Sequence, residues 1–587
     1  MALEQLNDMI KRCQVVPGDG FKPEDYDQFQ NAGRASLEQG HTAQVLDIIK
    51  DDKNKEIVRC MGWNLLGPLV QLILKKEEGS LQHCLAIFSN IMDVCSPKEL
   101  LVGLLEQVED ADADKIAETV LLLLQPLQTV LRTLGKKKAS SVGMSLSTIL
   151  NQLSQLPVPY TQEQEEDDTY GLCQCCTALL GFVGPFVEEV KQDQLSPDCG
   201  ENELRTELLK FCMKSLGEPL LQAQLSTDLD SPDSSPLRHF ATEILAILSN
   251  LGESLPGLLL HHLLKKKEEP GFLEEDAKYP RESLACLAYL LFVQHIAIER
   301  FPAVFSPVFV LHCNMQYIDV LLSRTEESRL SKGMELYEKS LVRTENNSLP
   351  VDLLDLKFFL TVPQNLVKVM TLCPIQHLRT KALAVFQLSI DKFDTEAKYK
   401  FFRCLLRTSH HAGVEGYIIK NIKNQIDYAL QPGNSNVWFS GAQMLTLLRC
   451  ILTLPEGPET DLLQNLDRIM ESLNLLRFLL IRDKECDNQT GVWTELYKIE
   501  ENYLKPLHTG LNMSRAHYEA ELKSTKENKK LKGSAESKCT VTVGNETLPN
   551  MTPEMQLQVL HSALFTFDLI ESVLARIEEI IEVKVKP

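Results

Sequence analysis

Basic residues are in deficit in this sequence. Its 587 residues contain 60 lysines and arginines against 81 aspartates and glutamates, a formal net charge of −21. Nucleic acids and anionic membranes are bound through clustered positive charge, so this balance argues against both as partners. The longest apolar runs, at 119–131 and 474–481, are too short or too interrupted to span a bilayer. We therefore expect neither nucleic-acid binding nor membrane insertion.

Aromatic residues and alternating strand patterns are also scarce. Phe, Trp and Tyr make up 6% of the chain, whereas leucine dominates the apolar residues, which favours helix over sheet. Alternation with a period of two is rare, and the only good strand candidate is "KCTVTVGNETL" near Val541. That is too little for a sheet, so the sequence predicts an all-α protein.

We expect neither a secretory leader nor a disulfide framework. Its first residues, "MALEQLNDMIKRCQ", contain no apolar signal core. Sixteen cysteines are scattered from Cys13 to Cys539, most of them inside apolar helical patterns and without regular spacing. Buried free cysteines behave as small hydrophobes, and this usage is typical of a reducing compartment. We expect a cytoplasmic protein.

Catalytic and metal-binding motifs are missing as well. The sequence contains no H-E-x-x-H, G-x-S-x-G or phosphate-binding P-loop pattern. Cys173, Cys175 and Cys176 are crowded into one helical turn, whereas a structural zinc site usually takes two separated pairs of ligands. Helix packing explains these thiols better. We read Glu165–Asp168 as an acidic loop rather than a positioned carboxylate pair, and we expect no enzyme activity, no metal and no cofactor.

What the chain does contain is a long succession of amphipathic helical patterns. In "PKELLVGLLEQVED", Leu100, Leu101, Leu104 and Leu105 form one apolar stripe. Each pattern lasts roughly 12–18 residues and stops at Gly, Pro, Ser or Asn; the pattern over 114–134 is predicted to be interrupted at Pro126. Many stripes are wide enough to need cover on two sides, which stacked helical hairpins provide. The sequence predicts an irregular HEAT-like α-solenoid, with a multi-domain helical bundle as the alternative.

Charge is unevenly distributed along the chain. Residues 401–587 contain 21 basic and 24 acidic side chains, whereas the first 400 residues contain 39 and 57. The final third is therefore electrostatically different from the rest of the chain, although chance drift would produce the same pattern. We expect exposed loops at 161–169, 191–202, 226–236, 265–279, 431–436 and 523–539.

Several stretches resemble the glomulin family. The likeness covers nearly the whole chain, is densest after Phe359, and departs mainly in the loops at 191–236, 265–279 and 523–539. The sequences that carry it include "MGWNLLGPLVQLIL", "YGLCQCC", "FLTVPQNLVKVMTLCPIQHLR", "LPEGPETDLLQNLDRIMESLNLLRFLLI", "DNQTGVWTEL" and "PEMQLQVLHSALFTFDLIESVLARIEE".

The resemblance implies more than the composition does. Glomulin-like proteins are helical, HEAT-like and non-catalytic, and they bind the RING-box subunit of cullin-RING ubiquitin ligases. Their C-terminal region covers the RING surface that docks the ubiquitin-conjugating enzyme, so ubiquitin transfer is blocked. The family is also associated with vascular development, immunophilins and a growth-factor receptor. The resemblance implies a scaffold over residues 1–360 and a RING-binding region over 361–587 in a chain that is monomeric by itself. The alternative is a general α-solenoid scaffold or signalling adaptor.

Five residues of the final third are candidates for partner contact. Arg477 lies inside an apolar run, where an arginine must pair, reach solvent or face a partner. We expect it to share a helix face with Leu473, Leu480, Ile481 and Lys484, while Leu475, Leu476, Phe478 and Leu479 form the core contact. Arginine and tryptophan are common interface anchors. The candidates are Lys420, Lys423, Arg477, Lys484 and Trp493; for Arg477 an internal or solvent role, and for Trp493 a buried contact at a helix start, remain open.

Overall fold

The structure is a computed structural model. It describes residues 2–15, 20–76, 78–135, 138–193, 202–225, 235–264, 278–434, 436–483, 488–531, 541–543, 546–548 and 553–585. Its residues form two compact units, Met1–Arg343 (unit 1) and Thr344–Pro587 (unit 2). Whether function divides at residue 360, as the resemblance implies, stays a prediction.

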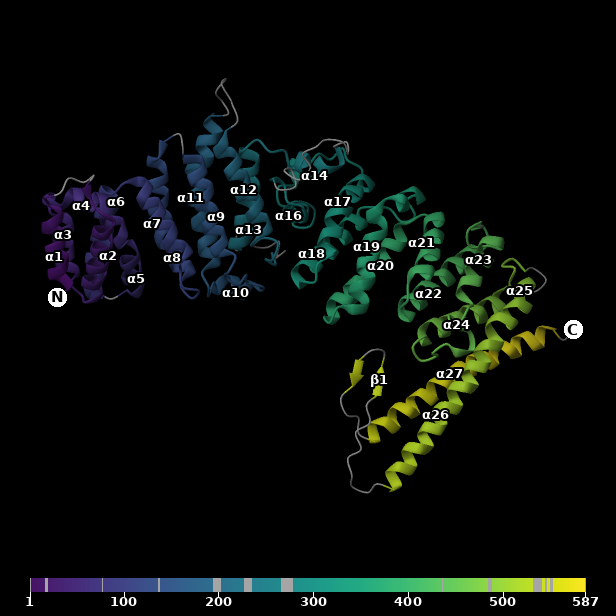
Figure 1. Cartoon of the computed structure of the whole chain (residues 1–587). Helices are drawn as coiled ribbons and strands as arrows, with labels where there is room; N and C mark the ends of the chain where they lie inside the picture. The colour runs from purple at the N-terminus through teal and green to yellow at the C-terminus, as the bar shows by residue number, and fades with distance from the viewer. Residues whose placement is uncertain are drawn as a thin grey trace. The chain divides into compact units, whose positions relative to one another are not determined.

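Unit 1 consists of helices that follow one another along the chain (Figure 1). Its α-helices are α1 (Ala2–Cys13), α2 (Pro23–Glu38), α3 (Thr42–Lys50), α4 (Lys55–Met61), α5 (Leu66–Lys75), α6 (Glu78–Val94), α7 (Pro97–Glu109), α8 (Ile116–Thr133), α9 (Lys138–Leu153), α10 (Gln162–Asp167), α11 (Leu172–Asp193), α12 (Glu203–Gly217), α13 (Pro236–Asn250), α14 (Leu255–Leu264), α16 (Arg281–Phe292), α17 (Pro307–Leu322) and α18 (Glu327–Val342). Its 3₁₀ helices are η2 (Asp52–Asn54), η3 (Gly62–Leu65) and η5 (Ile298–Arg300).

Unit 2 continues the same architecture and adds a small hairpin. Its α-helices are α19 (Lys357–Leu372), α20 (Gln376–Lys392), α21 (Thr395–Thr408), α22 (Ala412–Ala429), α23 (Gly441–Ile451), α24 (Leu466–Arg482), α25 (Val492–Ile499), α26 (Lys505–Leu531) and α27 (Pro553–Val585). Shorter turns are η6 (Val351–Asp355), η7 (Gly457–Glu459) and the π-helical η8 (Glu500–Leu504). Strands β1 (Val541–Val543) and β2 (Glu546–Leu548) pair antiparallel, with Val541 opposite Leu548. They lie in the segment that contained the strand candidate, but the sequence did not predict their pairing.

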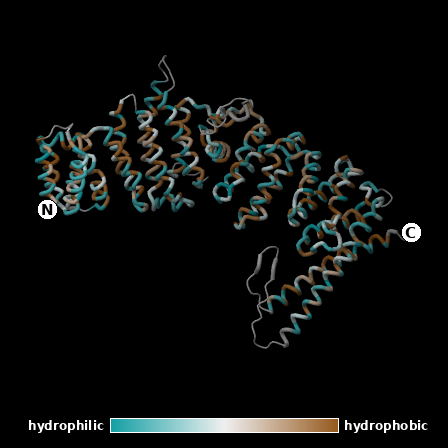
Figure 2. Tube along the Cα trace, in the orientation of Figure 1, coloured by the Kyte–Doolittle hydropathy of each residue, from teal (hydrophilic) through white to brown (hydrophobic). Residues whose placement is uncertain are grey.

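The helices pack against both their nearest and their next neighbours in the chain. In unit 1, α7 contacts α8 and α9, and α16 contacts α17 and α18; in unit 2, α22 contacts α21 and α24. Apolar and polar residues alternate along the helices accordingly (Figure 2). The predicted stripe of α7 is buried, with Leu100 and Leu104 no more than 1% exposed. The core of each unit is therefore a series of helix–helix contacts, and the predicted all-α, HEAT-like solenoid fold is confirmed.

Proline does not interrupt α8, contrary to the sequence prediction. Pro126 lies inside the helix, which runs on to Thr133. A proline within a helix costs about 3 kcal/mol or more because one backbone hydrogen bond is lost. Leu123, Leu127 and Leu131 on the same helix are fully buried, and burying each such side chain contributes about 1.5–3 kcal/mol. Tertiary burial therefore outweighs the local cost.

The acidic segment 161–169 is not a simple exposed loop. It contains the short helix α10, and Glu165 is only 5% exposed. The Glu165 carboxylate accepts hydrogen bonds from the Ser235 hydroxyl (2.6 Å) and the Leu237 backbone N–H (2.8 Å) at the start of α13. The Asp168 carboxylate accepts from the backbone N–H groups of Cys173 and Gln174 in α11. These carboxylates satisfy free N–H groups of helix N-termini, so the acidic residues have a structural function.

Candidate protein-binding surface

Helices α22 and α24 form a closely packed parallel pair in unit 2. A side chain at Gly416 would place its Cβ 2.9 Å from the backbone oxygen of Asp467, so glycine is needed for this approach. Beside it, Glu415 and Arg468 form an ion pair of 2.8 Å, with side chains 6% and 13% exposed. Arg468 also donates to the Cys450 carbonyl (3.3 Å). The Nε atom of Arg468 is buried without a hydrogen-bond partner, but a buried charge pair is costly to separate, so this pair favours one register of the two helices.

The outward sides of these two helices form one surface, which we call the α22–α24 surface. Lys420 is exposed, and Lys423 is half-buried with its amine 5.8 Å from the centre of the Phe478 ring. That distance permits a cation–π contact, which is worth about 0.5–1 kcal/mol at an exposed site. Arg477 is half-buried and Ile481 is 61% exposed. Exposed apolar area therefore lies among basic side chains.

Arg477 is available for a partner. Among the described residues it forms no ion pair or hydrogen bond, whereas Arg482 on the same helix lies 3.9 Å from Asp427. The side chains of Arg482 and Asp427 are each about half exposed, so their ion pair stabilises the fold little. Within the described ranges, Arg477 therefore differs from Arg482 in having no side-chain partner.

The predicted division of α24 into two faces is wrong in detail. Leu473 and Leu480, expected on the side of Arg477, are fully buried, whereas Phe478 is half-buried. The reason is that α24 packs against both α22 and α27. Two neighbours require an apolar stripe around more than half of the helix, so only a narrow outward side remains.

Trp493 joins the start of α25 to the end of α24. Its indole N–H donates to the backbone carbonyl of Asp483 (2.8 Å), the last residue capping α24. The Asp483 carboxylate in turn accepts from the N–H groups of Gln489 (3.0 Å) and Thr490 (2.8 Å). The half-buried ring therefore links the start of α25 to the end of α24. Of the two roles considered for Trp493, this is the contact at a helix start rather than a partner contact. Lys484 lies outside the described residues.

Sequence reasoning missed a second exposed surface on α27. Ala563, Phe567, Ile570 and Leu574 are buried, and Arg515 of α26 pairs with Asp568 and Glu571. Phe565 (63% exposed) and Leu569 (45%) lie on another side of the helix, because two residues turn an α-helix by about 200°. The signal that could have found this surface is a helix with two separate apolar stripes.

Two segments are long and apolar enough to cross a membrane by length and composition alone. Among the described residues, the most apolar 18-residue stretch of Asp52–Lys75 is 61% buried within the fold, whereas that of Glu554–Val583, with mean hydropathy 1.3, is 22% buried. Core helices of soluble proteins pass the same test, so it discriminates weakly. Our expectation that neither segment enters a membrane stays a prediction.

The crowded cysteines of α11 pack inside unit 1. Cys173, Cys175 and Cys176 are at most 3% exposed, and burial raises the pKa of Cys175 to about 12. Metals bind the thiolate, which burial disfavours here. Over the described ranges, no group of three or more His, Cys, Asp or Glu side chains is placed to hold a metal ion.

Comparison with known proteins agrees with a helical protein-binding chain. Residues 1–563 match the model of a protein family described as "Uncharacterised protein family, YAP/Alf4/glomulin". The chain is 54% identical to glomulin of Mus musculus over 589 residues and 55% identical to glomulin of Homo sapiens over 594 residues. Each alignment covers 100% of this chain and 98% of the relative. With a family match over residues 1–563 and relatives aligned over the whole chain, the chain belongs to the YAP/Alf4/glomulin family.

Proposed function

We propose that this chain is a non-catalytic inhibitor of cullin-RING ubiquitin ligases. It binds the RING-box subunit of the cullin-bound ligase through unit 2 and masks the surface that docks the ubiquitin-conjugating enzyme. Family membership supports this proposal. The structural observation that supports it is the α22–α24 surface, where Arg477 has no ion pair among the described residues and lies near the cation–aromatic pair of Lys423 and Phe478.

Such an inhibitor needs a rigid surface rather than chemistry. The ligase transfers ubiquitin only while a conjugating enzyme occupies its RING, so a competitor lowers the rate in proportion to the RINGs that it covers. The close approach at Gly416 and the buried Glu415–Arg468 pair hold the surface in one shape. A surface that is ordered before binding loses less entropy on binding and gains affinity.

The composition of the surface suits a protein interface. A stable interface buries roughly 1,200–2,000 Å² in total, with an apolar centre and a polar rim. Phe478 and Ile481 supply exposed apolar area on α24, and Lys420, Lys423 and Arg477 supply charge around it. The exposed stripe of α27 adds apolar area in the same unit. We place the protein in the reducing cytoplasm, in keeping with its free cysteines, 13 of which are described.

The test measures RING-box binding and ligase inhibition by a variant with two reversed charges. Lys423→Glu with Arg477→Glu should weaken binding to purified cullin–RING-box complex at least tenfold, about 1.4 kcal/mol. Arg477 has no internal partner among the described residues, and Lys423 has only its weak cation–π contact with Phe478. Helicity and thermal stability should therefore change little. Biolayer interferometry measures the affinity, and a ubiquitin-chain assay at stoichiometric inhibitor measures the function.

A matched reversal elsewhere in unit 2 provides the control. Arg407→Glu on α21 with Lys498→Glu on α25 changes the net charge equally at two exposed positions and should leave affinity within about twofold. If the first double variant binds as tightly as the parent, the RING does not contact the α22–α24 surface. If the parent chain binds the complex but leaves chain formation unchanged, the protein is a scaffold or adaptor, of the kind that serves immunophilins or a growth-factor receptor.

A further inference from the structure

A pocket of about 210 Å³ lies within unit 2, between η6, α19 and α21. Its lining shares no residue with the α22–α24 surface. The residues that form it are Val351, Asp352, Leu354, Asp355, Leu360, Lys400, Phe401 and Cys404. Small-molecule sites are usually larger, roughly 300–1,000 Å³. The size fits one long side chain of a protein partner.

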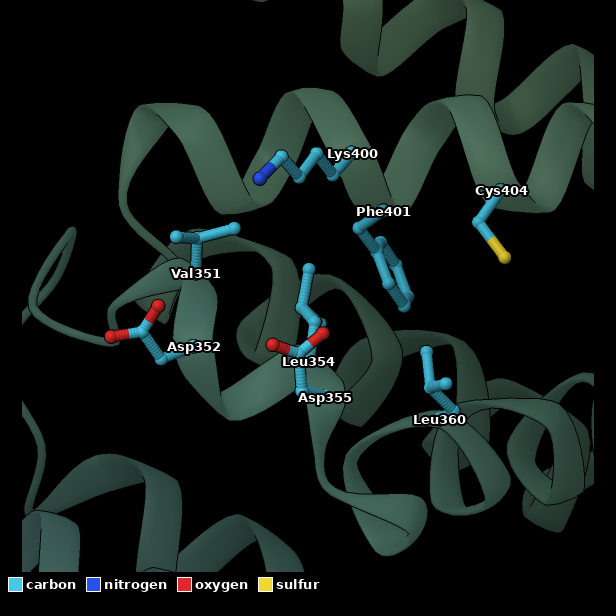
Figure 3. Close-up of a pocket in the computed structure, with 8 residues that line it drawn as sticks. All are labelled: Val351, Asp352, Leu354, Asp355, Leu360, Lys400, Phe401 and Cys404. Atoms are coloured by element: carbon cyan, nitrogen blue, oxygen red, sulfur yellow. The ribbon is translucent and has the colours of Figure 1, made fainter.

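The pocket has an apolar end and a polar end (Figure 3). The ring of Phe401, the side chain of Leu360 and the sulfur of Cys404 lie at one end, and the carboxylates of Asp352 and Asp355 lie toward the other. The two aspartates are three residues apart on η6, and side chains at that spacing point in the same direction in a 3₁₀ helix. The lining therefore combines an apolar floor with two neighbouring negative charges.

The negative charges of the pocket are only partly offset, because Asp352 and Asp355 are exposed and Lys400 is the one cation among the lining residues. Among the described residues, neither Asp352 nor Asp355 forms an ion pair. The amine of Lys400 pairs instead with Glu396 one turn earlier on α21, at 2.9 Å. That hydrogen bond, followed by the charges of Glu396, Asp355 and Asp352, raises the pKa of Lys400. The charges of three carboxylates thus act on one amine, so the polar end keeps a net negative charge and can accept a further cation.

The walls of the pocket are fixed before any partner arrives. The chain before η6 is bonded to the end of α20, where the Leu349 N–H donates to the Lys392 carbonyl (3.0 Å) and the Asp394 N–H donates to the Leu349 carbonyl (2.9 Å). The Phe401 ring lies 5.5 Å from the ring of Phe393. Both walls are therefore held by contacts outside the pocket, which favours binding of a matching side chain.

We infer that this pocket is a second docking site, which receives an arginine side chain from a protein partner. The aliphatic part of arginine covers the apolar floor beside Phe401 and Leu360. Its guanidinium reaches Asp352 and Asp355, and its planar set of donors can bond two carboxylates at once. Lysine carries one compact charge and fits this pair less well. No step of this inference depends on the RING interaction.

Cys404 makes the inference testable, because its half-buried sulfur lines the pocket. The probe is the blocked peptide Ac-Gly-Ser-Leu-Gly-Arg-Leu-Gly-Ser-NH₂, and its control carries neutral citrulline in place of arginine. The full-length chain is treated with the uncharged reagent iodoacetamide, and alkylation of each cysteine is followed by peptide mapping. Cys373 and Cys450, half-buried elsewhere in unit 2, are internal controls.

The arginine peptide at millimolar concentration should slow alkylation of Cys404 at least threefold, with no effect on Cys373 or Cys450. The citrulline peptide should not protect. Asp352→Asn with Asp355→Asn should abolish protection, whereas Lys400→Gln should strengthen it by removing a competing cation.

Equal protection by the citrulline peptide, or protection that survives the double Asp→Asn change, would overturn the inference. So would protection by a matched glutamate peptide that is lost in Lys400→Gln, because the pocket would then accept an anion. Thermal unfolding of each variant shows whether it is folded, and binding to the RING-box complex is expected to be unchanged in all of them.

Discussion

Trp493 illustrates how one side chain can resemble an interface anchor and still serve the fold. Its indole N–H satisfies the carbonyl of Asp483, which would otherwise be a free acceptor at the end of α24. The contribution of ring packing can be measured apart from that of the hydrogen bond. Phenylalanine retains most of the ring volume but has no N–H to donate.

We therefore expect Trp493→Phe to lower the free energy of unfolding by about 0.5–1.5 kcal/mol, the usual net value of one hydrogen bond. Affinity for the RING-box complex should stay within about twofold. Circular dichroism on heating and a binding titration give the two quantities. A tenfold loss of affinity at unchanged stability would instead assign Trp493 to the partner surface.

Lys332 of α18 is a buried cation in unit 1. It is 3% exposed, its amine donates to the carbonyl of Ala223, and it lies 5.4 Å from the centre of the Tyr289 ring. Burial lowers its pKa to about 8, from an ordinary value of 10.5. Folding therefore favours the neutral amine, and below pH 8 the protein retains a charged group in a site that disfavours it.

Stability should accordingly rise with pH in a defined window. Between pH 8 and 10.5 the unfolded chain binds more protons at Lys332 than the folded chain, so the free energy of unfolding increases, by at most about 1.4 kcal/mol per pH unit. Comparison with Lys332→Met removes the contributions of other groups. Urea unfolding at pH 7.5, 8.5 and 9.5 should show the parent gaining stability relative to the variant. A constant difference would mean that the amine keeps an ordinary pKa.

At the scale of elements, the α22–α24 pair depends on the absence of one side chain. A Cβ at Gly416 would lie 2.9 Å from the backbone oxygen of Asp467 and 3.1 Å from its carbonyl carbon. Backbone cannot move aside as a flexible side chain does. The two helices must separate, which disturbs the Glu415–Arg468 pair next to the contact.

Gly416→Ala should thus destabilise unit 2 by about 1–3 kcal/mol, the usual cost of overpacking, and weaken binding at the α22–α24 surface. Gly181→Ala in α11 is the control, because a Cβ there meets nothing within 4 Å. In a helix interior that change should stabilise by roughly 0.5–1 kcal/mol. Thermal unfolding of both variants checks the contrast; equal effects would show that the helix contact tolerates a methyl group.

Patterns within one element could be predicted from the sequence, whereas contacts between distant elements could not. Periodicity predicted the buried stripe of α7, since the pattern and the buried residues belong to one segment. It did not reveal that Glu165 bonds the start of α13, because these partners are 72 residues apart at Leu237. The pocket at Asp352 and Phe401 was missed for the same reason: its two walls come from distant segments, and neither carries a local pattern.

At the scale of the whole molecule, the two units differ in charge. The final third is near neutral while the first 400 residues hold most of the negative charge. The α22–α24 surface and the exposed stripe of α27 both belong to unit 2. These features support a division of labour in which unit 2 binds the RING and unit 1 serves other contacts.

Separating the units tests this division. A cut at residue 400 would divide α21 and remove the neighbours that bury the Phe401 ring. A cut between Arg343 and Thr344 instead follows the boundary of the compact units. Residues 344–587 should bind the RING-box complex with an affinity within about tenfold of the full chain, 1.4 kcal/mol, and should suppress chain formation. Residues 1–343 should do neither, while remaining helical by circular dichroism. Each fragment keeps the helix contacts within its own unit. Failure of residues 1–343 to bind or inhibit could therefore not be ascribed to unfolding. Binding and inhibition by residues 1–343 would instead move the RING contact out of unit 2 and, with it, away from Lys423 and Arg477.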